Sequence, residues 1–255
     1  MGIGAVGSYA SAYSPYSTLA AGGALQSASQ DAAGLAIEEK TKAQTGALDK
    51  GSENLRDAKS ALNVADGAME GIADYLGSIK ELAIRSQNGT LNDSDRKSIQ
   101  SQIDQYLKGI DETAKGTTYN EKNLLNSEDK LSVSTDANGG KADVSTYDLS
   151  VKGLGLEGLD VTSPDFDMKA IDDAIKKVDS SRANTGAETN RADYAASYNS
   201  KASLELNGYA MDKEENRTVK ALQDLKAKQA TDQYQIMLQK KKQEDEAHQA
   251  QMFFA

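Results

Sequence analysis

The side chains that most often carry chemistry in proteins are scarce in this chain. His248 is the single histidine and lies in a charged stretch near the end of the sequence, and cysteine is absent. A catalytic or metal-binding imidazole needs neighbouring groups that orient it, and the residues around His248 offer no evident source of them. Without cysteine there is no disulfide, thiolate metal site or thiol nucleophile. We therefore expect no catalytic residues, no metal site, no cofactor and no enzyme activity.

An acidic run at 92–95 has a structural explanation. Residues 92–95 read Asn-Asp-Ser-Asp, which lacks the spacing of a calcium-binding loop. Asn92 and Asp95 stand three residues apart, as a helix N-cap and its reciprocal partner do. Other carboxylates alternate with lysines at helical spacing, as in Glu38 and Lys42, which is typical of solvated helix faces.

Composition points to narrow helical packing. Of 255 residues, 38% are hydrophobic and 5% aromatic, and the only prolines are Pro15 and Pro164. A long stretch without proline permits long helices. The formal net charge of −10 disfavours nucleic acid and anionic membranes as partners. No apolar run approaches membrane-spanning length, and no basic residue precedes Lys40, so we expect neither membrane insertion nor a Sec-type signal.

A heptad pattern identifies the element most strongly specified by the sequence. Two sets of residues, each spaced seven apart and offset by three, alternate as the a and d positions of a coiled coil do. We call the large residues of this pattern the bundle seam: Leu48, Leu55, Leu62, Met69, Ile72, Leu76 and Ile79. Gly51, Ala58 and Ala65 fill the small positions. The pattern predicts a helix that packs along its length rather than one that builds a pocket.

The remaining chain divides into three segments around this helix. Residues 1–26 carry no charge but include Tyr9, Tyr13 and Tyr16, and we expect 1–20 to be flexible, with helix possible from about Leu19. This leader is either a disordered tail or a segment that orders in a complex. We expect residues 27–195 to form a helical-bundle domain that contains the heptad helix. We expect residues 196–255 to form a charged C-terminal helix or tail.

Within the bundle domain, turn signals set the expected elements. The first helix should run from about residue 27 to 87, where Asn88-Gly89 stops it, and a second from 92 to about 114. Alternating apolar and polar residues at 131–134 and 143–151, separated by Asn-Gly-Gly at 138–140, predict a hairpin within a β element at about 117–165. Helix should resume at about Asp167. The expected fold class is mainly α: an elongated helical bundle or coiled coil with a small β-hairpin.

Several runs resemble one family. The sequence SQDAAGLAI at 29–37 is similar to the signature near the start of bacterial flagellins, and DGAM at 66–69 with KELAI at 80–84 resembles a later flagellin pattern. Thr118-Tyr119-Asn120 stands at a family turn, although Glu121 replaces the turn glycine. Residues 171–191 resemble the returning flagellin helix. The resemblance covers about 27–127 and 168–195.

The resemblance implies a structural subunit of the bacterial flagellar filament. Such a protein is extracellular, exported by the flagellar type III apparatus with an export chaperone, and assembles by coiled-coil packing as a homo-oligomer or with other flagellins. The glycine-rich start and the charged end depart from the family pattern. The alternative function is therefore a paralogue that does not polymerise and acts as an export-linked binding or regulatory module.

The resemblance also implies a receptor-contact or subunit-contact face. Flagellins are recognised by a Toll-like receptor through the first-helix pattern and the adjacent second helix. The matching residues here are Lys80, Glu81, Leu82, Ile84, Asn88 and Gln102. Because Ser78 replaces an arginine of the receptor-binding pattern and Gln102 a glutamate, we expect weakened receptor recognition.

Overall fold

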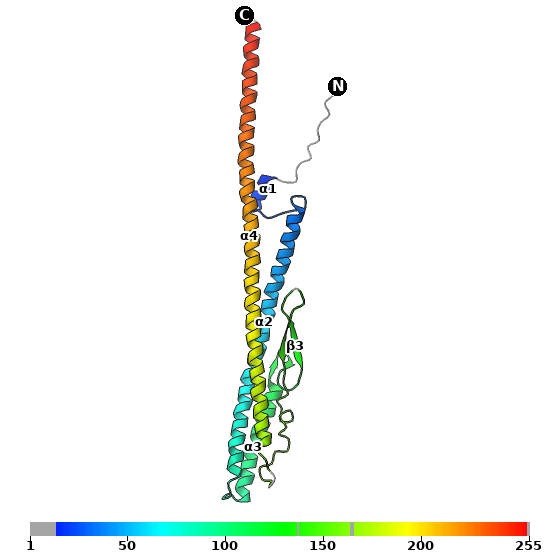
Figure 1. Cartoon of the computed structure of the whole chain (residues 1–255), viewed down its shortest axis with the longest axis vertical. Helices are drawn as coiled ribbons and strands as arrows, with labels where there is room; N and C mark the ends of the chain where they lie inside the picture. The colour runs from blue at the N-terminus through cyan, green and yellow to red at the C-terminus, as the bar shows by residue number, and fades with distance from the viewer. Residues whose placement is uncertain (1–13, 137, 164–165, 254–255) are drawn as a thin grey trace. The chain divides into compact units, whose positions relative to one another are not determined.

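The computed structural model describes residues 14–136, 138–163 and 166–253, with no side-chain detail beyond 248. Tyr9, Tyr13 and most of the predicted flexible leader therefore lie outside the described residues. The helices are α1 (Pro15–Ala20), α2 (Ala32–Ser86), α3 (Asp93–Gly116) and α4 (Lys169–Phe253) (Figure 1). The strands are β1 (Thr118–Tyr119), β2 (Lys122–Asn123), β3 (Lys130–Ser134) and β4 (Lys141–Ser145). The predicted class, mainly α with a small β element, is confirmed.

The chain forms two compact units. The terminal unit comprises Met1–Thr45 and Ser203–Ala255, and the central unit is Gly46–Ala202. Both boundaries fall inside the continuous helices α2 and α4, where nothing in the hydrophobic pattern marks a break. The division expected from composition, at 26/27 and 195/196, follows changes in charge instead and stays a prediction.

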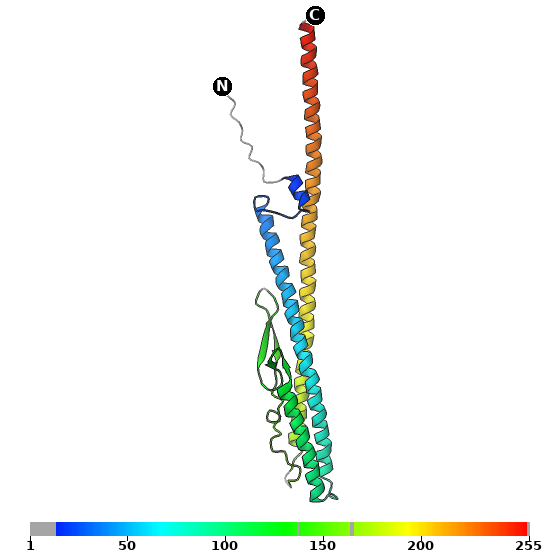
Figure 2. The ribbon, with the colours of Figure 1, turned by 180° about the vertical axis from the view of Figure 1, so that it is seen from behind.

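The hydrophobic core lies in the central unit, where α2, α3 and α4 pack together and the β3–β4 hairpin lies alongside (Figures 1 and 2). Met69, Ile72 and Leu76 of α2 are fully buried, as are Ile103 and Ile110 of α3. The 3.6-residue repeat places these side chains on one stripe of each helix, so each helix buries its stripe against the others. The loop after β4 adds Leu149, Leu154 and Leu156 to the core, and α4 adds Ile171, Ala174 and Val178.

The junction between α2 and α3 follows the predicted turn chemistry. Helix α2 ends at Ser86, one residue before the expected limit, and α3 begins after Asn92. The Asn92 side chain accepts from the Asp95 amide at 2.9 Å, and the Asp95 carboxylate accepts from the Asn92 amide at 3.2 Å. The predicted capping pair is thus confirmed, and it satisfies amides that have no partner inside the helix.

Two antiparallel hairpins follow α3. In the first, β1 pairs with β2, and Asn120 and Glu121 form the two-residue loop. Both loop residues are left-handed, with φ of 46° and 63°, as a type I′ turn requires. In the second, β3 pairs with β4 across the predicted turn, with Leu131 opposite Val144. The Asn-Gly-Gly signal therefore located this hairpin.

Three expected boundaries differ from the structure. Helix begins at Pro15 rather than Leu19, because proline fits the first helical turn, where its missing amide is not needed. Helix α2 starts at Ala32 rather than near residue 27, since Asp31 accepts from the Gly34 amide at 2.8 Å and caps the helix there. Strand β4 ends at Ser145 instead of 151, because Asp148 turns the chain by accepting from Ser150.

The terminal unit depends on a close approach of main chains. Gly23 has φ of +89°, and a Cβ at this position would collide with the carbonyl oxygen of Glu214 on α4. Arg217 of α4 donates to the Gly23 carbonyl at 2.6 Å, so the segment after α1 is held against α4. Among the described residues, no helix is both long enough and apolar enough to cross a membrane.

Candidate interaction surfaces

The bundle seam faces inward along most of α2. Leu48 is 8% exposed, whereas Met69, Ile72, Leu76 and Ile79 have no exposed surface. Leu55 and Leu62 are almost as deeply buried. These seven side chains are therefore part of the packing of this chain and are unavailable to a partner while the central unit is folded.

The expected receptor-contact or subunit-contact face is only partly open. Glu81 and Ile84 are exposed on α2, and Ile84 exposes 56% of its surface. Lys80 instead donates to Asp172 of α4 at 2.8 Å, and its ammonium lowers the pKa of that carboxyl. Leu82 is half-buried against the core.

The last two residues of that face lie beyond this stretch of α2. Asn88 is exposed in the turn, and Gln102 is exposed on α3. The structure thus leaves Glu81, Ile84, Asn88 and Gln102 open, while Lys80 and Leu82 contribute to the bundle.

The β3–β4 hairpin is attached to the helices through its main chain. Asn54 of α2 donates to the Ser134 carbonyl at 2.9 Å, and Asn199 of α4 donates to the Thr135 carbonyl at 2.7 Å. Gly51 belongs here too, since a Cβ on Gly51 would collide with the same Thr135 oxygen. The small position of the heptad pattern is therefore explained by a close contact with the hairpin.

A buried carboxylate attaches the other strand of this hairpin. Glu188 of α4 is 9% exposed, and it accepts from the Ser145 amide at 3.0 Å and from the Ser145 hydroxyl at 2.6 Å. Nearby, burial raises the pKa of the Tyr147 phenol. Hydrogen bonds to a charged acceptor are stronger than neutral ones, so this contact fixes β4 on α4.

Two side chains of α3 hold the irregular segment that follows β4. Gln100 donates to the Leu159 carbonyl and accepts from the Val161 amide, both at 2.8 Å, much as a neighbouring strand would. Asp111 accepts from the Val151 amide at 2.9 Å. That bond, together with Lys115, lowers the pKa of Asp111. Sequence patterns gave no signal for either residue, because both contacts join positions at least 40 apart.

The terminal unit contains an ion pair that the sequence reading missed. Arg217 of α4 donates to Glu38 of α2 at 2.9 Å, with 23% and 21% of the two side chains exposed. The same guanidinium binds the Gly23 carbonyl. Glu38 was interpreted as part of a solvated face with Lys42. Its spacing could not reveal a partner 179 residues away.

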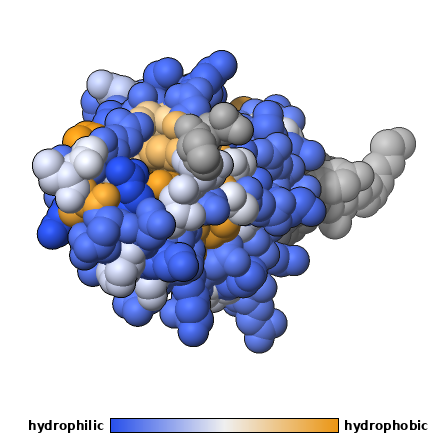
Figure 3. Space-filling model, turned by 90° about the horizontal axis from the view of Figure 1, so that it is seen from below, coloured by the Kyte–Doolittle hydropathy of each residue, from blue (hydrophilic) through white to orange (hydrophobic). Residues whose placement is uncertain are grey.

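The C-terminal part of α4 exposes apolar side chains. From 226 to 248 every residue is exposed, including Tyr234, Ile236 and Met237 at 63%, 54% and 65%. Val219 and Leu222 are 49% and 43% exposed, whereas Ala221 is fully buried. The face drawn in Figure 3 is mainly hydrophilic, with smaller hydrophobic areas.

His248 is exposed on α4. Among the residues that the structure describes, no cluster of three or more histidine, cysteine, aspartate or glutamate side chains is arranged to hold a metal ion.

Comparisons with known proteins agree with this architecture. Residues 10–130 match the model of the bacterial flagellin N-terminal helical region. The phase 1 flagellin of Salmonella naestved is 34% identical over 147 residues, which cover 57% of this chain and 29% of the relative. The flagellin of Salmonella dublin gives the same values. The chain therefore spans less than a third of the length of these curated relatives.

Solved structures extend the likeness to the fold. The crystal structure of Bacillus cereus flagellin superimposes with a TM-score of 0.52 at 25% identity, covering 58% of this chain and 88% of that one. A structure described as a flagellar hook-associated protein of Vibrio parahaemolyticus gives 0.60 at 18% identity, covering 72% and 96%. At that identity the second match concerns the fold alone.

The class of protein is a helical bundle that carries two small antiparallel hairpins. Residues 10–130 of this chain are similar to the bacterial flagellin N-terminal helical region, and the fold is similar to that of Bacillus cereus flagellin.

Proposed function

We propose that this protein is a structural subunit of the bacterial flagellar filament that works outside the cell. The match of residues 10–130 to the flagellin N-terminal region supports this proposal. A bundle whose apolar side chains pack into one continuous core along α2, α3 and α4 fits a structural role.

The proposal that the chain assembles rests on exposed apolar side chains of α4. We call Tyr234, Ile236, Met237 and Leu238 the distal apolar set; these side chains are 44–65% exposed. A helix without tertiary contacts is only marginally stable in water, and partner packing supplies the missing stabilisation. The proposed partners are other copies of this chain or other flagellins.

Electron microscopy of the purified protein, with and without filament seeds, tests this function. We expect fibres for the wild-type chain and loss of fibres for the double variant Ile236→Asp/Met237→Asp. The matched control Gln239→Asp adds a charge beside the set without removing an apolar side chain. A persistent monomer under seeded conditions would contradict the proposal and favour the alternative, an export-linked binding module.

Export and receptor recognition form finer parts of the proposal. We propose that the flagellar type III apparatus exports the chain with a dedicated chaperone, which would bind the monomer before assembly. Recognition by a Toll-like receptor should be weak, because Lys80 is bound to Asp172 and Ser78 and Gln102 provide no charge at the expected contacts. Saturable binding as tight as that of the Salmonella dublin flagellin would contradict this part.

A further inference from the structure

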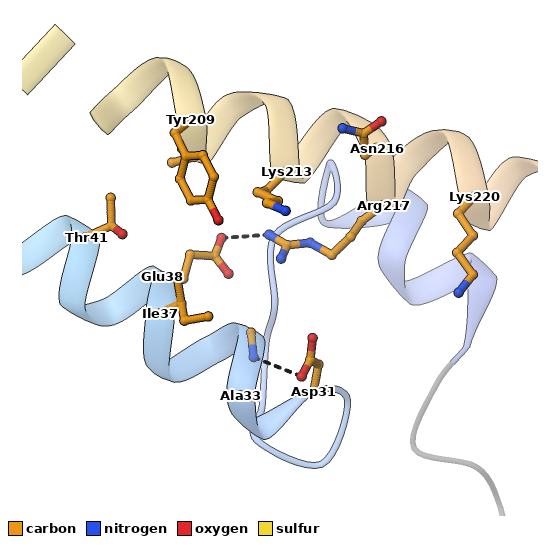
Figure 4. Close-up of a pocket in the computed structure, with 12 residues that line it drawn as sticks. Asp31, Ala33, Ile37, Glu38, Thr41, Tyr209, Lys213, Asn216, Arg217 and Lys220 are labelled. Atoms are coloured by element: carbon orange, nitrogen blue, oxygen red, sulfur yellow. Dashed lines mark hydrogen bonds and ion pairs between the residues drawn. The ribbon is translucent and has the colours of Figure 1, made fainter. Parts of the chain in front are cut away.

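The terminal unit contains a cavity of about 420 Å³ that the proposed function does not use. It lies between the beginning of α2, from Asp31 to Thr41, and the stretch of α4 from Tyr209 to Lys220. Cavities of about 300–1,000 Å³ are typical of small-molecule sites. Figure 4 shows the side chains of both helices around it.

One part of the cavity lining is apolar. Ile37 and Tyr209 are 53% and 46% exposed, and Ala33 and Ala210 line the cavity with them. Covering these surfaces with a hydrocarbon chain would remove apolar area from water, which is favourable. The lining therefore fits the apolar body of a ligand.

Another part of the lining is cationic. Lys213 and Lys220 lie seven residues apart on α4 and line the cavity, and neither forms an ion pair with any described residue. Lys213 lies 5.3 Å from the centre of the Tyr209 ring, so its charge stands beside the apolar surface. Asp31, which also lines the cavity, is engaged with the Gly34 amide. The two lysines thus favour an anionic group at one end of a ligand.

Glu38 adds a requirement for a donor. Its Oε1 accepts from Arg217, but its Oε2 is buried and has no hydrogen-bond partner among the described residues. In Figure 4 the Glu38 side chain projects from α2 toward Arg217 and Lys213. A buried acceptor without a partner is costly. Because Oε2 has almost no accessible surface, a ligand N–H reaches it only when the Glu38 side chain turns toward the cavity.

We propose that this cavity binds a small amphiphilic anion of the N-acyl amino acid class. The acyl chain would cover Ile37 and Tyr209, the carboxylate would lie at Lys213 and Lys220, and the amide N–H would donate to Glu38 Oε2. The ligand class combines an apolar body, an anion and an adjacent donor, which are the three features that the lining presents.

Isothermal titration calorimetry of the full chain with N-octanoylglycine, below its micelle concentration, tests the proposal. We expect saturable binding with one site per chain. N-octanoylsarcosine carries a methyl group on the amide nitrogen and has no N–H. Its affinity should therefore be lower than that of N-octanoylglycine by about tenfold or more. N-octanoylglycinamide, which lacks the carboxylate, should also bind at least several-fold more weakly.

Substitutions inside and outside the cavity test whether the ligand binds there. Ile37→Asp should abolish binding, whereas Leu222→Asp, a matched apolar-to-acidic change on α4 outside the cavity, should not. Lys213→Gln should weaken N-octanoylglycine without changing the helical circular dichroism, which guards against loss by unfolding. Absence of saturable binding, equal affinity for the glycine and sarcosine compounds, or unchanged binding in Ile37→Asp would each overturn the proposal.

Discussion

Single residues in this chain show where local geometry conflicts with residue preference. Asn120 and Glu121 are both left-handed, and a left-handed conformation costs a residue with a side chain about 1–2 kcal/mol. Asparagine adopts the left-handed backbone conformation more readily than most residues, whereas glutamate has no such preference. The resemblance to flagellins had placed a glycine at position 121, and the backbone explains why glycine suits it.

Glu121→Gly should therefore stabilise the protein by about 1 kcal/mol. The free energy of unfolding, measured in urea, reports the change. Glu121→Ala is the control, because alanine keeps the left-handed cost while removing the carboxylate. Equal stability of the glycine and alanine variants would contradict the explanation.

Asp111, another single residue, makes a pH-dependent contribution to the free energy of unfolding. Its pKa is lowered by the Val151 amide and by Lys115, so the unfolded chain binds its proton more tightly than the folded one. The stabilisation is therefore present above the unfolded pKa of about 4 and is lost as the pH falls through the lower folded value.

Asp111→Asn tests this sign. We expect the variant to be less stable at pH 7 by about 1 kcal/mol or less, because the carboxylate is partly exposed. The difference should shrink toward zero as the pH falls through the folded pKa of Asp111, which lies below the unfolded value. Urea unfolding of both proteins from pH 7 to 2 measures it, and a difference that stays constant would exclude an ionised Asp111 as its source.

At the scale of elements, the β3–β4 hairpin and the helices constrain each other. Gly51→Ala would push a methyl group into the Thr135 carbonyl and should destabilise the central unit by about 1–3 kcal/mol. Gly67→Ala is a matched control in the same helix, since a Cβ there meets nothing within 4 Å.

The control should gain about 0.5–1 kcal/mol, because alanine favours a helix interior over glycine. Urea unfolding of the two variants and of the wild-type chain provides the comparison. A loss at Gly67 equal to that at Gly51 would show that general helix effects, rather than the hairpin contact, decide the outcome.

The sequence predicted elements whose signals are local. The heptad repeat, the Asn92–Asp95 cap and the Asn-Gly-Gly turn each depend on neighbours within a few residues, and each was found. Gln100, Asp111 and Arg217 were missed because a polar side chain does not reveal a main-chain partner tens of residues away. The cavity lining was missed for the same reason, since it joins residues 31–41 to 209–220.

At the scale of the whole molecule, the two units differ in what stabilises them. The core cluster lies within the central unit, whereas α4 beyond 225 exposes every residue as far as 248. Helix that lacks buried apolar contacts opens locally at low free-energy cost. The units should therefore differ sharply in their susceptibility to protease.

Limited trypsin digestion should cleave first at Lys226, Lys228 and Lys240. Lysines of the central unit, such as Lys59 and Lys80, should be cut later, because they lie on packed helices and pair with Asp193 and Asp172. Mass spectrometry of early time points identifies the cuts. Initial cleavage inside residues 46–202 would contradict this order, and protection of the C-terminal lysines in seeded fibres would indicate that assembly covers them.

The way in which the hairpin is attached has a consequence for how the chain can change length. Asn54, Asn199 and Glu188 bind main-chain atoms at 134, 135 and 145, all outside the Asn-Gly-Gly residues 138–140. Contacts to main-chain atoms are indifferent to the side chains that the hairpin carries, and longer loops add little closure entropy. Extra sequence, even a whole added domain, could be inserted at this turn while the hydrogen bonds between the helices and the hairpin stay the same.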